Sequence, residues 1–112
     1  MVGTLLLSPV QAQKKVSATE AKERYGENAS VCGEVVSTRY AASSKGKPTF
    51  LNLDKPYPDQ VFPVLIWGSN RVKFGTPEAD YKDKKICVTG KITAYDGLPE
   101  IIADDPKQIR IE

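Results

Sequence analysis

The stretch KKICVTGKITAYDGLPE, residues 84–100, contains the pattern that decides the fold. Its first part, residues 84–95, is rich in apolar and β-branched residues and predicts a long strand, which Gly90 interrupts. A glycine inside a strand is typical of a bulge or of a sharp bend in a small barrel. The Asp96-Gly97 pair is a strong signal for a two-residue hairpin, so the next strand is predicted to turn back beside this one. The stretch therefore predicts a bent hairpin in a curved sheet.

Helix signals precede the strands in VSATEAKERYGEN, residues 16–28. Ser17 is a good N-cap, and Glu20 three residues later completes a capping box. Gly26 stands where a helix would end in the left-handed conformation. We therefore predict a short helix over residues 18–25.

The order of the remaining elements is that of a known small barrel. Apolar and β-branched runs predict strands at residues 29–40, 48–54, 61–67, 84–95 and 98–112, the last of them broken at residues 104–106. Between the third and fourth strands, Thr76 can cap a second short helix and Pro77 suits its first position. Five strands with a helix between the third and the fourth is the order of the OB-fold. The predicted fold is mainly β: a five-stranded OB-fold Greek-key barrel with a short N-terminal helix and a short helix between strands 3 and 4.

Composition and charge limit the possible classes of protein. The 112 residues are 40% hydrophobic and 27% charged, which suits one globular domain. No stretch reaches the roughly 18 apolar residues that a membrane-spanning helix needs, so no membrane span is predicted. The formal net charge of +2 is too small to drive strong non-specific binding to a polyanion. Any affinity for nucleic acid therefore requires a local basic patch.

The first twelve residues, MVGTLLLSPVQA, differ from the rest of the chain. They contain no charged residue, and they end with the small-x-small pattern of a signal-peptidase site at Val10 and Ala12. We predict that residues 1–12 are the remnant of an export signal and that the protein is periplasmic or extracellular. The alternative is a disordered N-terminal extension. In either case, residues 13–112 are predicted to form a single OB-fold domain.

The second predicted strand places a large aromatic ring on the side that should face water. With period two, Leu51 and Leu53 point toward the core, while Phe50, Asn52 and Asp54 point outward. The outer face of strands two and three of an OB-fold binds oligonucleotides or oligosaccharides. Phe50 therefore suits a platform on which a base stacks. The alternative is that Phe50 covers the barrel beneath the N-terminal helix.

Further residues are candidates for the same site. Trp67, at the end of the third strand, either extends the platform or fills the space under the helix at residues 77–82. The other candidates for contact with nucleic acid are polar, basic or aromatic residues of the neighbouring strands and loops: Arg39, Tyr40, Lys45, Lys47, Asn52 and Arg71. The alternative is that these residues are ordinary surface or sheet-rim residues that contact no ligand.

The pattern VCGEVVST…GKPTFLNLDKPYPDQVFPVLIW…R…Y…KKICVTGKITAYDGLPEI resembles small exported bacterial OB-fold proteins. These are loosely related to the nucleic-acid-binding OB domains of extracellular nucleases such as the YhcR-like group, and the resemblance covers residues 16–111. Within it, TFLNLD is similar to a segment of the anticodon-binding OB domains of some aminoacyl-tRNA synthetases, in which the first aromatic stacks on a base. The resemblance implies that Phe50 is a stacking residue. The synthetases commonly have an arginine near the end of this segment, where this chain has Asn52 and Asp54.

Cys32 and Cys87 lie in the first and fourth predicted strands, which a closed OB-fold brings side by side. We predict a disulfide between them, because an exported protein is in an oxidising compartment. The alternative is two buried free thiols. The chain has no histidine and no CxxC motif, which argues against a zinc site and excludes histidine-based catalysis. No motif indicates an enzyme, a metal site or a cofactor, and an OB-fold nuclease is the alternative that no motif supports.

The expected function is that of a non-catalytic OB-fold module that binds single-stranded DNA or RNA by aromatic stacking and by Lys and Arg contacts to phosphate. The alternative is an exported OB-fold protein that binds a protein or an oligosaccharide and has no nucleic-acid activity. The salt dependence of binding separates the two, because phosphate contacts release counterions and saccharide contacts do not.

Overall fold

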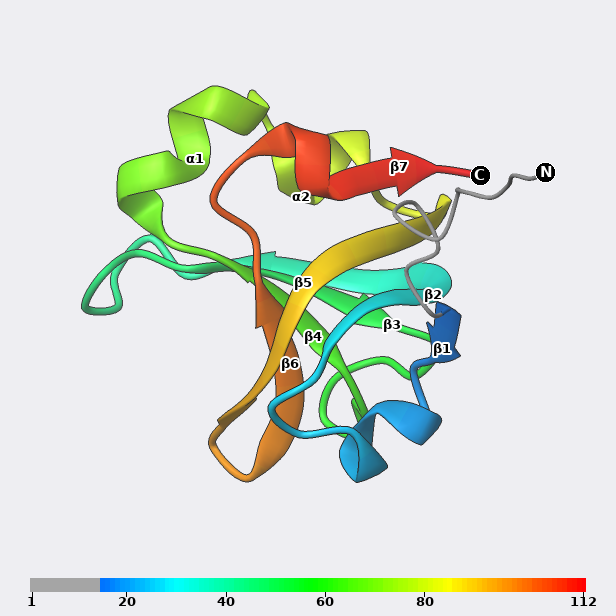
Figure 1. Ribbon diagram of the computed structural model, residues 1–112. Helices are drawn as coiled ribbons and strands as arrows, with labels where there is room; N and C mark the ends of the chain where they lie inside the picture. Colours follow the sequence, from blue (N-terminus) through cyan, green and yellow to red (C-terminus); the bar gives the residue numbers. More distant parts are fainter. Residues whose placement is uncertain (1–14) are drawn as a thin grey trace, which may run out of the picture.

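The computed structural model describes residues 15–112, which form a mainly β structure, as predicted (Figure 1). The strands are β1 (Lys15–Ser17), β2 (Asn28–Tyr40), β3 (Thr49–Leu53), β4 (Pro63–Ile66), β5 (Lys85–Tyr95), β6 (Leu98–Ile102) and β7 (Ile109–Ile111). Their order in the sheet is β1-β2-β3-β4-β6-β5-β7, and β2 also pairs with β5. This last pairing closes β2, β3, β4, β6 and β5 into a ring of five strands, each at a position where the sequence predicts a strand.

Two long strands make the ring possible, because each pairs with different neighbours along its length. Residues 28–34 of β2 pair with β5, and its later residues pair with β3, with a register irregularity between Val35 and Ser37. The predicted bends at Gly33 and Gly90 are places of close approach. A Cβ atom on Gly33 would lie 2.9 Å from Asp54 Oδ1, and one on Gly90 would lie 2.8 Å from Ile101 Cγ2. Both glycines therefore let a neighbouring side chain approach the strand.

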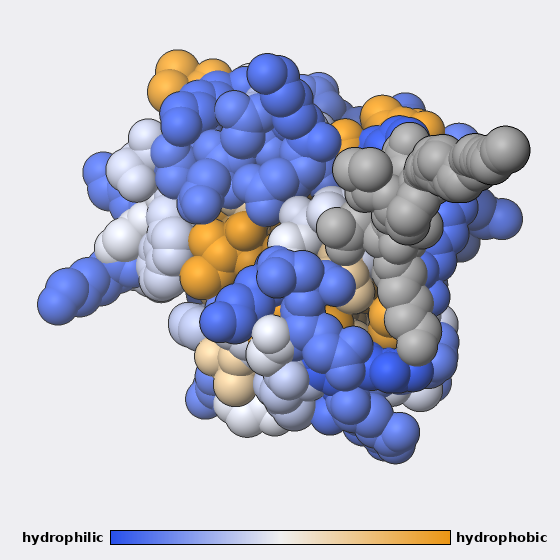
Figure 2. Space-filling model, viewed as in Figure 1, coloured by the Kyte–Doolittle hydropathy of each residue, from blue (hydrophilic) through white to orange (hydrophobic). Residues whose placement is uncertain are grey.

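The inward side chains of the ring form the core. Leu51 and Leu53 of β3 are fully buried, as their parity predicts. The other large side chains that are completely buried in this cluster come from the remaining four strands of the ring and from the β3–β4 loop: Val31, Val35, Phe62, Val64, Ile66, Ile86, Val88, Ile92 and Ile101. Burial of each such side chain stabilises the fold by about 1.5–3 kcal/mol. The face of the molecule seen in Figure 1 is mainly hydrophilic, with small apolar patches (Figure 2).

The predicted N-terminal helix is shorter than expected. It is the 3₁₀ helix η2 (Glu20–Glu23), in which the Arg24 N–H donates to the Ala21 carbonyl at 3.0 Å. The predicted capping box is present, because the Ser17 N–H donates to Glu20 Oε1 and the Glu20 N–H donates to Ser17 Oγ, both at 3.1 Å. Ser17 itself belongs to β1, which pairs in parallel with β2, and Gly26 has a φ of +86°. Few residues remain between these two ends, so only one 3₁₀ turn forms.

The second predicted helix, residues 77–82, is also shorter. It is α2 (Pro77–Asp80), with Pro77 in its first turn as predicted, although the Thr76 side chain makes no capping hydrogen bond. Asp83 prevents a longer helix, because its φ is +66° and its N–H donates to the Val35 carbonyl at 2.8 Å. Helix α1 (Gly68–Phe74) was not predicted, because it begins with the turn-forming residues Gly-Ser-Asn.

The last predicted strand is divided into β6 and β7 by the 3₁₀ helix η3 (Pro106–Gln108). Asp105 caps η3 in a reciprocal capping box with Gln108. As a result, β6 pairs with residues 92–95 of β5, whereas β7 pairs with residues 86–88 of the same strand.

The predicted disulfide is confirmed. Cys32 of β2 and Cys87 of β5 are direct antiparallel partners, their Cα atoms are 4.0 Å apart, and their sulfurs are bonded. The bond lies in the pairing that closes the ring. The predicted export signal, residues 1–12, lies outside the described residues. None of the helices in residues 15–112 has the length and apolar character needed to cross a membrane.

Candidate functional site

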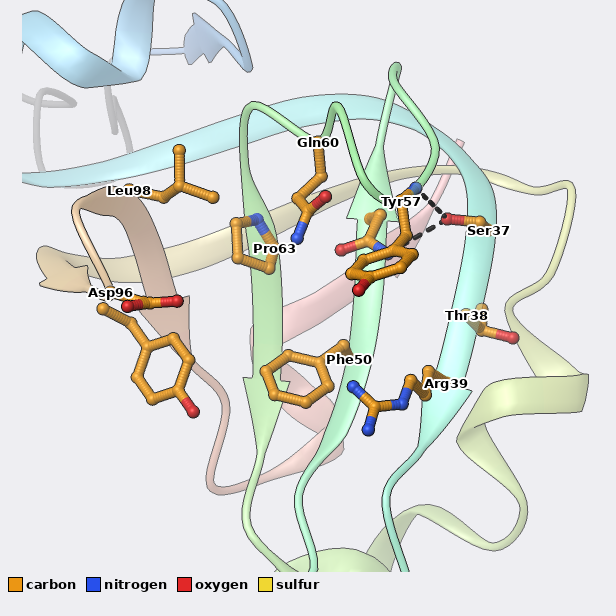
Figure 3. Close-up of a pocket in the computed structure, with 11 residues that line it drawn as sticks. Ser37, Thr38, Arg39, Phe50, Tyr57, Gln60, Pro63, Asp96 and Leu98 are labelled. Atoms are coloured by element: carbon orange, nitrogen blue, oxygen red, sulfur yellow. Dashed lines mark hydrogen bonds between the residues drawn. The ribbon is translucent and has the colours of Figure 1, made fainter. Parts of the chain in front are cut away.

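A groove with a volume of about 410 Å³ lies on the outer face of β2, β3 and β4, beside the hairpin that joins β5 and β6 (Figure 3). We call it the outer groove. It is lined by Ser37, Thr38, Arg39, Phe50, Asn52, Tyr57, Gln60, Pro63, Tyr95, Asp96 and Leu98.

Three aromatic rings open into the outer groove. Phe50 is half-buried and lies outside the core cluster, and its ring centroid is 5.9 Å from that of Tyr95, with the planes tilted by 47°. Leu65 of β4 is the direct cross-strand partner of Phe50, is fully buried and also lies outside the core cluster, so the two side chains share one face of the sheet. Tyr57 is 65% exposed and Tyr95 is 38% exposed. The groove therefore offers several apolar ring faces to a ligand.

Two amide side chains of the outer groove have oxygens that lack partners. Asn52 is only 3% exposed, and its Nδ2 donates to Ser37 Oγ at 3.0 Å. The Tyr57 N–H donates to the same hydroxyl at 3.3 Å. Within the described part of the chain, the buried atoms Asn52 Oδ1 and Gln60 Oε1 have no hydrogen-bond partner. Buried polar atoms are nearly always satisfied in native proteins, so these two acceptors require an explanation.

Arg39 supplies positive charge to the outer groove. It is exposed and is the cross-strand neighbour of Phe50. Among residues 15–112, no acidic side chain forms an ion pair with it. Asp96, in the β5–β6 turn, lies on the opposite side of Phe50 (Figure 3). The charge of Arg39 is therefore available to an anionic ligand at one side of the ring.

Two of the predicted binding residues lie elsewhere, in a cluster between β2, α1 and α2. The guanidinium carbon of Arg71 is 3.8 Å from the centre of the Tyr40 ring, and its Nη2 is 2.6 Å from Glu78 Oε2. The Arg71 and Glu78 side chains are each 24% exposed. Arg71 is thus neutralised by a structural ion pair, and neither Arg71 nor Tyr40 lines the outer groove.

Trp67 is associated with the β2–β3 loop. A Cβ atom on Gly46 would lie 2.8 Å from Trp67 Cζ3, so the indole packs directly against that glycine. The Gly68 N–H also donates to the Gly46 carbonyl, at 2.9 Å. Lys45 and Lys47 flank Gly46 and are exposed. They lie at the end of the β2–β3 hairpin nearest to Phe50, outside the lining of the groove.

The β3–β4 loop contributes to the site, which the sequence did not predict. KPYPDQ, residues 55–60, lies between the second and third predicted strands, and the structure brings Tyr57 and Gln60 of this loop into the outer groove. An aromatic residue between two prolines was the available signal. Tyr95, the last residue of the predicted strand at residues 84–95, also lines the groove and is the ring partner of Phe50.

Glu100 of β6 is an unusual buried carboxyl group, with 2% of the residue exposed. Burial raises its pKa, and a hydrogen bond from the Thr93 hydroxyl to Oε2, at 3.3 Å, lowers it in part. Its Oε1 atom has no partner within residues 15–112. The described residues contain no group of three or more His, Cys, Asp or Glu side chains that could hold a metal ion.

Comparison with known proteins leaves the chemistry of the outer groove to be inferred from its own residues. No protein-family model matches the chain, and no curated protein matches it in sequence.

Proposed function

We propose that this protein is a non-catalytic OB-fold module that binds single-stranded DNA or RNA in the outer groove. The five-strand ring, with α1 and α2 between its third and fourth strands in chain order, supports the OB-fold assignment. In that fold, the outer face of the second and third strands, which are β3 and β4 here, is the usual ligand surface.

The position of Phe50 is the observation on which the proposal rests. A half-buried phenyl ring, next to Leu65 on the neighbouring strand and adjacent to Tyr95, presents an apolar face in a groove that is open to solvent. Every base has a flat aromatic face, so such a platform binds single strands with little sequence preference. One stacked base contributes about 1–3 kcal/mol.

The charges suit a short contact with the phosphate backbone. Arg39 lies in the groove, and Lys45 and Lys47 lie beyond its Phe50 end. One to three phosphate contacts to a single strand give a slope of log K against log salt of about −0.7 to −2. Because Arg71 is paired with Glu78, we leave it out of the proposed interface.

An oligosaccharide is the second candidate ligand, because the unpartnered amide oxygens of Asn52 and Gln60 can accept hydrogen bonds from sugar hydroxyls. Its binding would be insensitive to salt, since no counterions would be released.

The test is fluorescence anisotropy of labelled 15-nucleotide DNA and RNA at low and physiological salt. We expect Phe50→Ala to weaken binding by about 5- to 150-fold, the equivalent of one stacked base. Arg39→Gln should make the salt slope shallower by about 0.7. Two exposed residues near η2 provide matched controls: Tyr25→Ala removes an aromatic ring and Lys22→Gln removes a charge, and both should bind as the wild type does.

Absence of salt-sensitive binding at low salt would overturn the proposal. Equal losses in Phe50→Ala and Tyr25→Ala would show that the groove is not the interface. Salt-insensitive binding to a saccharide, or capture of a protein partner by the groove, would favour the alternatives.

We also propose that the protein is exported. The Cys32–Cys87 disulfide supports this location, because such bonds persist in the periplasm and outside the cell and are rare in the cytosol.

A further inference from the structure

We infer that the amide end of the outer groove, formed by Asn52 and Gln60, selects a base that carries an exocyclic amino group, and therefore binds cytosine in preference to thymine or uracil. This inference rests on the proposed function, and it adds a base preference to a stacking site that would otherwise accept any base.

Hydrogen bonds to Ser37 fix the orientation of the Asn52 amide. Ser37 Oγ accepts hydrogen bonds from Asn52 Nδ2, at 3.0 Å, and from the Tyr57 N–H, at 3.3 Å. These two bonds occupy both lone pairs of the hydroxyl. The Asn52 nitrogen is thus fixed toward Ser37, and Oδ1 remains as the buried acceptor of this side chain, without a partner within residues 15–112.

The two amide oxygens of this end of the groove require hydrogen-bond donors. Asn52 Oδ1 and Gln60 Oε1 are both buried, and both lack a partner within residues 15–112. Both side chains line the outer groove. A buried acceptor without a partner is destabilising, so a ligand that supplies N–H donors at this place gains affinity. A ligand that places carbonyl oxygens there leaves the acceptors unsatisfied and adds repulsion between like dipoles.

Cytosine differs from thymine and uracil in the group at position 4 of the ring. They stack alike, but cytosine presents an amino group with two N–H donors at position 4, where thymine and uracil present a carbonyl acceptor. The two unpartnered acceptors of the groove match the amino group. Phe50 and Tyr95 then supply the stacking surface, which does not distinguish the two bases.

The experiment measures the affinities of labelled dC15 and dT15 under one condition, at pH 8, where cytosine is unprotonated. We expect dC15 to bind about 5- to 10-fold more tightly than dT15. Gln60→Met keeps the length of the side chain and removes the acceptor. It should reduce the ratio to less than about 3-fold by weakening dC15, with dT15 unchanged. Asn52→Ala should also reduce the ratio, with urea unfolding as the control for its stability.

Phe50→Ala is the contrasting variant, because loss of the stacking ring should weaken both oligonucleotides and leave their ratio unchanged. Binding of dC15 and dT15 with equal affinity, a preference for dT15, or a ratio unchanged by Gln60→Met would overturn the inference and leave the proposed function standing. Binding of neither oligonucleotide, at low salt and with RNA probes as well, would overturn both.

Discussion

The disulfide between β2 and β5 should contribute more to stability than any other single bond in the chain. Cys32 and Cys87 are separated by 55 residues, and the loop between them contains β3, β4, α1 and α2. In the chain-entropy model, a cross-link over a loop of this length removes enough freedom from the unfolded chain to stabilise the fold by about 4 kcal/mol at 25 °C. Typical domains have a total free energy of unfolding of about 5–15 kcal/mol. Loss of this bond should therefore leave a marginal fold.

Urea unfolding, followed by the fluorescence of Trp67, measures the effect directly, because the chain has a single tryptophan. The oxidised protein is compared with the same protein in a reductant and with the double variant Cys32→Ala/Cys87→Ala. With an m-value of about 1–2 kcal/mol/M, the midpoint should fall by about 2–4 M in both cases.

A loss of less than about 1 kcal/mol on reduction would refute the entropic reasoning, because it would mean that the unfolded chain already holds β2 and β5 together. Two free thiols, found by mass spectrometry of the non-reduced protein, would contradict the bond itself.

Three further predictions concern other parts of the fold. Gly46→Ala should lower stability by about 1–3 kcal/mol and alter the emission of Trp67, since Gly46 has a φ of +78° and contacts the indole; an unchanged urea midpoint and spectrum would contradict this. Because the folded-state pKa of Glu100 is raised, the wild type loses stability as the pH rises through that pKa. Glu100→Gln should therefore be more stable than the wild type at pH 8 and equal to it near pH 4. An equal difference in the free energy of unfolding at both pH values would refute the raised pKa. Glu78→Gln should cost about 1–2 kcal/mol in thermal unfolding, because it leaves the half-buried Arg71 guanidinium without its counterion; an unchanged melting temperature would count against the structural ion pair.

Local backbone chemistry made most of the ring predictable from the sequence. Asp96 and Gly97 both have positive φ values, +51° and +81°, as the predicted two-residue hairpin requires. The parity of Leu51 and Leu53 identified the core face of β3, and Phe50 lies on the other face. These features depend on a few adjacent residues, so a single sequence contains them.

The features that escaped prediction depend on contacts between distant segments. β1 has only three residues, and it is extended because it pairs with β2. Arg71 was predicted to contact the ligand, but it pairs with Glu78 instead. The sequence does not reveal this ion pair, because it forms only when α1 and α2 pack together. Tyr57 joins the outer groove because its N–H bonds to Ser37, twenty residues earlier in the chain.

Closure of the five-strand ring also bears on self-association. Every strand of the ring has neighbours on both sides, so in residues 15–112 the strands with an unpaired edge are β1 and β7, of three residues each. Unpaired edges are the templates on which β-sheet proteins add further chains and aggregate, and short edges are poor templates. Lys15 and Glu112, whose charged groups are 3.9 Å apart, place charge at both of these edges. A chain rich in β-structure is thereby protected against edge-to-edge polymerisation for as long as the β2–β5 pairing holds.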